Sequence, residues 1–112
     1  MTAANYNLTI DQGSDFAIQL TLSEDNSAKN LTGYEARAQM RSKKSDVSAA
    51  AAFTCTIVDA VLGKIKVSMA NGTTSQLSPG IYYYDLELFT NEDGNVTRLI
   101  EGQVTVTQEV TR

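Results

Sequence analysis

The 112-residue sequence contains no histidine and no tryptophan, and only one cysteine, Cys55, and one proline, Pro79. Without histidine no Ser–His or Cys–His catalytic pair can form, and the commonest transition-metal ligand is missing. A lone cysteine cannot form a disulfide within the chain, and in an apolar strand it is interpreted as a small core side chain. We therefore expect no metal site and no cofactor.

Long apolar runs and a basic patch are missing as well. No apolar stretch approaches the roughly 18 residues that a membrane-spanning helix needs, and the start of the sequence lacks the basic and apolar segments of a signal peptide. Nine basic residues stand against thirteen acidic ones, for a net charge of −4, which is the wrong sign for neutralising phosphates. We expect synthesis in the cytoplasm and no membrane or nucleic-acid partner.

The length and the 42% hydrophobic content indicate one globular domain spanning residues 1–112. A chain of this size buries roughly two-thirds of its unfolded surface, so it can build a core without metals or disulfides.

Apolar and polar residues alternate along most of the sequence, which predicts half-buried β-strands. Turn-forming residues recur about every ten positions and predict a turn at 11–13, a loop at 23–30 and hairpin turns at 62–64 and 91–95. A helical turn is expected near Thr74–Leu77, and the helix-favouring stretch Ser48–Ala52 is interpreted as part of a loop, because it is too short for an independent helix. The predicted strands cover residues 6–10, 15–22, 34–41, 53–58, 65–69, 81–89 and 96–107. In the first of them Tyr6, Leu8 and Ile10 are expected on one face. Seven to eight short strands with this spacing predict an antiparallel, Ig-like β-sandwich, although the Cys–Trp–Cys core of antibody domains is missing.

Two predicted strands carry candidate interface residues on their outer faces. In the strand over 34–41 every second residue is polar or charged, and these include Arg37 and Arg41. In the strand over 81–89 the outer face carries Ile81, Tyr83 and Phe89, and tyrosine and arginine are favoured at protein interfaces. The alternative is that a loop of the same chain covers these aromatic residues.

Acidic pairs are the remaining candidates for chemistry. Asp85 and Glu87 share one strand face, but nothing in their surroundings indicates a substrate pocket with perturbed groups. The acidic turn at 91–95 fails as a calcium loop, because the required terminal glutamate is missing. We expect no enzyme and no small-molecule substrate.

Four segments resemble a known family. They are YNLTIDQGSDF at 6–16, NLTGYEARAQMR at 30–41, GIYYYDLEL at 80–88 and RLIEGQVTV at 98–106. In this order they are similar to the N-terminal domain of phage baseplate upper proteins and to stand-alone virion proteins that have this domain. The resemblance implies an Ig-like sandwich that serves as an attachment or adaptor module in the virion of a tailed bacteriophage.

Three functions follow as hypotheses. The first is a virion structural protein of the tail, baseplate or neck, which contacts other virion proteins in a symmetric, multi-copy assembly. The second is a capsid decoration, or cement, protein that stabilises the head lattice by contacts with the major capsid protein. The third is a carbohydrate-binding sandwich, which needs exposed aromatic platforms and is disfavoured by the lack of tryptophan.

Overall fold

The computed structural model describes residues 4–24, 27–90 and 94–111. The strands are β1 (Ala4–Asn5), β2 (Leu8–Asp11), β3 (Phe16–Thr21), β4 (Ser23–Glu24), β5 (Ser27–Ala28), β6 (Glu35–Arg41), β7 (Ala51–Asp59), β8 (Lys64–Met69), β9 (Gly80–Phe89) and β10 (Val96–Thr107). The helix among the described residues is the single turn α1 (Asn71–Thr74), which is too short and too polar to cross a membrane. The predicted all-β class is confirmed.

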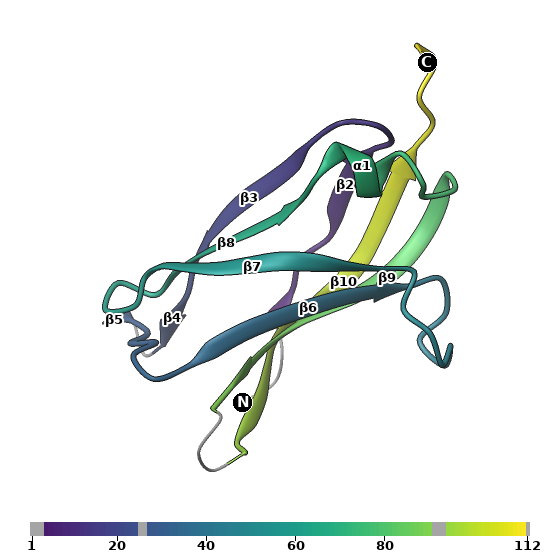
Figure 1. The fold of residues 1–112 in the computed structure, drawn as a ribbon. Helices are drawn as coiled ribbons and strands as arrows, with labels where there is room; N and C mark the ends of the chain where they lie inside the picture. The colour runs from purple at the N-terminus through teal and green to yellow at the C-terminus, as the bar shows by residue number, and fades with distance from the viewer. Residues whose placement is uncertain (1–3, 25–26, 91–93, 112) are drawn as a thin grey trace.

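Most strands belong to one curled sheet in the order β1-β10-β9-β6-β7-β8-β3, with β2 also pairing with β10. The curl places β7, β8 and β3 over the strands β2, β10, β9 and β6 (Figure 1). We call these the second layer and the first layer. Strand β7 joins them, since residues 51–53 pair with β6 and residues 54–59 pair with β8. The predicted sandwich-like fold is therefore confirmed.

The sheet is mixed, whereas the prediction was antiparallel throughout. Strands β1 and β2 both run parallel to β10, with Leu8 opposite Val104 and Asp11 opposite Thr107. The other ladders of the large sheet are antiparallel. The difference arises at the predicted turn around Gly13, which carries the chain from one layer to the other, so that β2 pairs with the last strand instead of with β3.

The core lies between the layers. Its best-buried members come from β2, β6, β8, β9 and β10, and the side chains below 2% exposure include Ile10, Met40, Ile65, Leu86, Leu88 and Val104. Phe53 connects the layers, with its ring centroid 6.0 Å from Phe16 and 6.1 Å from Tyr84. Offset and edge-on aromatic contacts at this distance stabilise cores beyond the area that they bury.

Three local predictions need correction. Tyr6 was expected to share the core face of Leu8, but it is 47% exposed, because the edge strand breaks between β1 and β2 at Tyr6–Asn7. The helical turn begins at Asn71 rather than near Thr74. Residues 48–50 form the predicted loop, and the Ala50 amide donates to the Met40 carbonyl where the chain enters β7. The predicted loop at 23–30 contains the short β4–β5 ladder.

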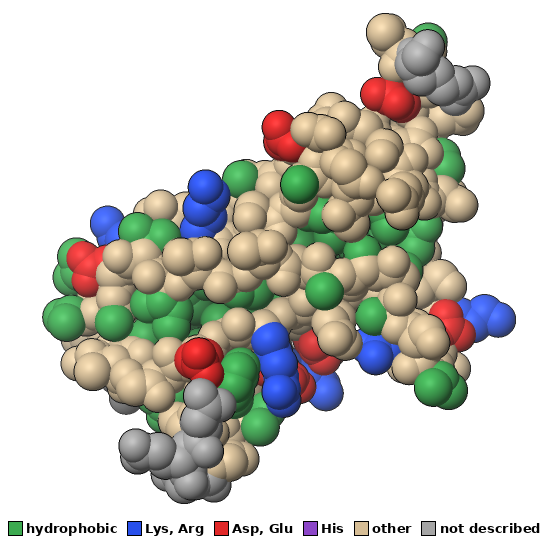
Figure 2. Space-filling model, in the orientation of Figure 1, with side chains coloured by type: hydrophobic (Ala, Val, Ile, Leu, Met, Phe, Trp, Pro, Cys, Tyr) green, Lys and Arg blue, Asp and Glu red, His purple; other side chains and the backbone are tan. Residues whose placement is uncertain are grey.

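The two predicted hairpins are present. The β7–β8 turn contains Gly63 at φ 69°, and the β9–β10 turn contains Gly94 at φ 69°, a region that glycine enters without strain. Residues 91–93 of the second turn lie outside the described residues. Strands β6 and β7 pair only through residues 38–40 and 51–53, and hydrophobic surface is visible between them where they separate (Figure 2).

Candidate docking face

The outward side chains of β6, β9 and β10 form a lattice, which we call the outer β6–β9–β10 face. The strand registers set its rows: Arg37, Glu87 and Arg98 lie side by side, then Gln39, Asp85 and Glu101, and then Arg41, Tyr83 and Gln103. Directly opposed residues on one face of an antiparallel pair have Cβ atoms about 5 Å apart and interact. Alternation along β6, β9 and β10 therefore places the charged side chains of all three strands on one surface.

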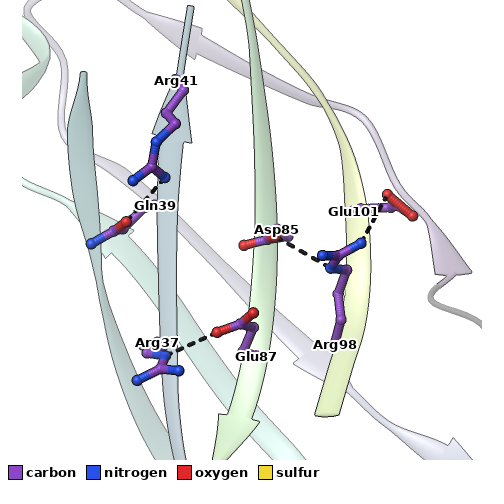
Figure 3. A network of polar contacts seen from close by, with 7 residues as sticks. All are labelled: Arg37, Gln39, Arg41, Asp85, Glu87, Arg98 and Glu101. Atoms are coloured by element: carbon purple, nitrogen blue, oxygen red, sulfur yellow. Dashed lines mark hydrogen bonds and ion pairs between the residues drawn. The ribbon is translucent and has the colours of Figure 1, made fainter. Parts of the chain in front are cut away.

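Ion pairs join the three strands across this face (Figure 3). Arg37 Nε donates to Glu87 Oε1 at 2.9 Å, and Arg98 Nε lies 3.3 Å from Asp85 Oδ2. Arg98 Nη1 also lies 3.9 Å from Glu101 Oε2. Because the arginine side chains are more than half exposed, each pair contributes at most about 1 kcal/mol. The pairs orient the side chains more than they stabilise the fold.

A β-bulge in β10 places Arg98 in this network. The register with β9 shifts between Arg98 and Ile100, and Leu99 and Ile100 are consecutive yet both only 6% exposed. The extra residue lets Arg98 and Glu101 both face outward, and bulges are known to redirect side chains in this way. Sequence reasoning missed both residues, although the apolar doublet interrupts the alternation and is a usable signal.

The five predicted interface residues all lie on this face. Arg37 Cζ is 4.7 Å from the Phe89 ring centroid, and Tyr83 lies opposite Arg41 in the ladder. Ile81 stands at the far end of β9 and is 56% exposed. Phe89 and Tyr83 are each half-buried, so neither is completely covered by its own chain.

The loop after β6 borders the face at Tyr83. Arg41 Nε donates to the Asp46 carbonyl at 3.0 Å, and the Asp46 carboxylate accepts from the Lys43 amide at 3.2 Å. These contacts fold the loop back, and Lys44 Nζ lies 5.7 Å from the Tyr83 ring centroid. Lysine over an aromatic ring at this distance is a weak cation–π contact, which a partner can replace at small cost.

A shallow polar hollow of 160 Å³ lies at the centre of the face, lined by Gln39, Arg41, Lys44, Tyr83, Tyr84, Asp85, Arg98 and Glu101. Partial burial raises the pKa of Asp85, and Glu87 raises it further, while Arg98 and Arg41 act in the opposite direction. The lining of the hollow contains positively charged hydrogen-bond donors, such as Arg41 and Arg98, and negatively charged acceptors, such as Asp85 and Glu101. Among the described residues no cluster of three or more Cys, Asp or Glu side chains is arranged to hold a metal ion.

Comparisons with known proteins show the fold. No protein-family model matches the sequence, and the search of curated proteins finds no match. Among solved structures, the chain is similar to the N-terminal domain of phage TP901-1 ORF48, with a TM-score of 0.61 and 13% identity, over 95% of this chain and 98% of that one. A family 123 glycoside hydrolase from Clostridium perfringens gives a TM-score of 0.44 at 11% identity, covering 24% of the hydrolase, too weak a likeness for any argument.

Proposed function

We propose that this chain is a non-enzymatic structural protein of a tailed-phage virion, which docks onto neighbouring subunits in the tail, baseplate or neck. The observation that carries the proposal is the likeness in fold to the N-terminal domain of a phage protein, which extends over 95% of this chain. The order of the four sequence segments at 6–16, 30–41, 80–88 and 98–106 supports the same assignment.

The outer β6–β9–β10 face is the proposed docking surface. It combines exposed arginines with half-buried aromatic rings, and both residue types are enriched where protein interfaces bind most strongly. Its ion pairs and its central hollow are polar, which suits a surface that is exposed before assembly and desolvated afterwards. Docking would replace the weak contact of Lys44 with Tyr83 by contacts with the neighbouring subunit.

A capsid decoration protein is the second candidate. It fits the same small acidic domain, and it predicts contacts with the major capsid protein at the head lattice. The two candidates differ in copy number, because a lattice protein accompanies most capsid subunits and a tail component does not.

The first experiment is quantitative mass spectrometry of purified particles, with this chain measured against the major capsid protein. A small ratio is expected for the tail, baseplate or neck. A ratio close to that of the capsid protein would replace the leading proposal by decoration, and absence from particles would overturn both.

The second experiment tests the face itself. The double variant Arg37→Glu/Tyr83→Ala, supplied to particles that lack the native chain, is expected to lower incorporation at least tenfold, because it removes a charge and an aromatic contact. The matched control is Lys66→Glu/Thr56→Ala, which changes two outward residues of the second layer that lie opposite each other in the β7–β8 ladder. Equal incorporation of both double variants would exclude this face as the docking surface.

A further inference from the structure

Strand β3 ends the large sheet, so one side of it has no neighbour among the described residues (Figure 1). The Leu22 amide, just after β3, donates to the Gly63 carbonyl at 2.8 Å. Bonded positions alternate in an antiparallel ladder, so Phe16, Ile18 and Leu20 direct their main-chain groups toward β8. The amides and carbonyls of Ala17, Gln19 and Thr21 therefore point away from the sheet.

This edge lacks the features that usually prevent pairing. Strand β3 spans six residues, Phe16–Thr21, and has no charge, no proline and no register shift against β8. Exposed edge strands are normally protected by charged residues, prolines, bulges or short length. The opposite edge has such protection, because it is divided into the two-residue β1 and the four-residue β2 with Tyr6–Asn7 between them.

The inward side chains of the same strand are incompletely covered. Phe16, Ile18 and Leu20 are all half-buried, although β8 next to them buries Ile65 and Val67 to 3% exposure or less. A mainly apolar cavity of 290 Å³ also opens between β3 and the β1–β10 edge, with Leu20 and Leu22 in its lining. An added strand would therefore contribute apolar cover as well as hydrogen bonds.

We propose that β3 pairs antiparallel with β3 of a second copy of this chain, about a two-fold axis at Gln19. In this register Ala17 of one copy faces Thr21 of the other, and the two Gln19 residues face each other, so all three outward positions find bonding partners. The six-stranded array would run β7-β8-β3-β3-β8-β7. The inference is independent of the virion role, since it concerns only the edge of the sheet.

A second copy fits this edge because the strand is complementary to itself. The two-fold register sets Ile18 opposite Leu20 of the other copy, so half-buried apolar side chains cover one another, as an isologous interface requires. Each Gln19 lies opposite a Lys66 in β8. The two Lys66 residues would stand three strand spacings apart, about 14 Å, which exceeds the screening length of about 8 Å at physiological salt.

The test is sedimentation equilibrium of the isolated chain from micromolar to millimolar concentration. The expected mass rises from 12.1 kDa to twice that value. Gln19→Lys should keep the mass at one copy, because it places two like charges directly opposite each other. Thr54→Lys is the matched control, since Thr54 is exposed on β7, away from the edge, and it should dimerise like the native chain.

The Ala17→Pro variant tests edge pairing without adding a charge. The Ala17 amide points away from β8, so proline there removes no bond of its own ladder but blocks the bond to the second copy. Amide exchange measured by NMR should show Ala17, Gln19 and Thr21 protected in the dimer and unprotected in both edge variants. A monomer at all concentrations, a dimer that survives both edge variants, or equal loss in Thr54→Lys would overturn the proposal.

Discussion

The two layers of this protein are buried to different degrees. In the first layer the inward side chains of β6, β9 and β10 are almost completely covered, with Met40, Leu88 and Val104 at 0% exposure. In the second layer only the middle strand, β8, reaches this level, while Ile18 of β3 and Ile57 of β7 are half-buried. Strand β8 is paired along both sides, whereas β3 is paired on one side only and β7 pairs with β6 only at residues 51–53. The second layer should therefore contribute less per residue to the free energy of unfolding than the first layer, and its open edge is the better candidate for association.

The outer faces of the two layers also differ in charge. The outer β6–β9–β10 face carries acids and arginines in cross-strand pairs. In the second layer Lys66 lies between the neutral Gln19 and Thr56, and Lys64 has Thr21 and Asp59 opposite it in the two ladders. Paired charges give a surface a defined pattern that a partner can match. This contrast is the reason for assigning docking to the first layer.

The largest expected effect compares the same substitution in both layers. Leu86→Ala in the first layer removes a side chain that is 1% exposed, and it should lower the free energy of unfolding by about 4 kcal/mol. Leu20→Ala removes a half-buried side chain of β3 and should cost about 1.5 kcal/mol. Urea denaturation measures both, at concentrations where the chain is monomeric. Equal losses would contradict the difference between the layers.

The second prediction concerns how the second layer is closed at its hairpin. A Cβ atom at Gly63 would lie 2.6 Å from the Leu22 carbonyl and 2.7 Å from the Lys29 carbonyl, at φ +69°. Gly63→Ala should cost about 3 kcal/mol, because backbone strain adds to the clash. Gly33 has a similar φ of +86° but nothing within 4 Å, so Gly33→Ala should cost about 1 kcal/mol from strain alone. The difference in melting temperature between the two variants isolates the clash.

The third prediction uses one weak acid from each layer. Burial raises the pKa of Cys55 in β7 from 9.0 to about 11. Burial, with a contribution from Tyr6, raises the pKa of Tyr84 in β9 from 10.0 to about 12. Because both pKa values are higher in the folded chain, the unfolded chain loses each proton at a lower pH than the folded chain. The free energy of unfolding therefore declines as pH rises from 9 to about 11 for the thiol and from 10 to about 12 for the phenol.

Cys55→Ala should flatten the stability profile from pH 9 upward, and Tyr84→Phe only from pH 10. The flattening should amount to no more than about 1 kcal/mol for Cys55→Ala, because the half-buried thiol is partly screened by solvent. It should be larger for Tyr84→Phe, because the Tyr84 side chain is only 7% exposed. Denaturation midpoints at a series of pH values provide the measurement. A profile of Cys55→Ala that is parallel to that of the native chain would show that the thiol is not desolvated.

The smallest effect is expected on the outer surfaces. Arg37→Ala removes an exposed ion pair with Glu87 and the contact with Phe89, and it should cost about 0.5 kcal/mol. Lys66→Ala in the second layer should change stability by less than this. High salt should reduce the difference between the two variants, since screening weakens exposed pairs. An Arg37→Ala loss above about 2 kcal/mol would mean that the pair supports the fold rather than orienting a surface.

Local structure followed from the alternation of residues, whereas pairing between distant strands did not. The last strand was predicted and found at Val96–Thr107, and the strand predicted at 81–89 is β9 with one residue more. The parallel pairing of β2 with β10 could not be predicted, because periodicity states which side of a strand is buried and not which strand lies next to it.

The same distinction applies to the candidate docking face. Alternation placed Arg37, Arg41, Ile81, Tyr83 and Phe89 on outward positions, and the β6–β9 register then brought them onto one surface. Arg98 and Glu101 were missed because the bulge shifts the side on which they stand. The ion pair of Arg98 with Asp85 makes that carboxylate a member of an ion-pair network.

The parallel ladder between β2 and β10 has a consequence for the order of events on the ribosome. Thr107 and Asp11 are hydrogen-bonded although 96 positions separate them, so Leu8–Asp11 has no permanent partner until Val104–Thr107 has been synthesised. Domains dominated by such non-local contacts fold in milliseconds to seconds. During elongation the nascent chain therefore carries an unpaired N-terminal strand, and chaperones that bind extended apolar segments would have their longest access to this protein there.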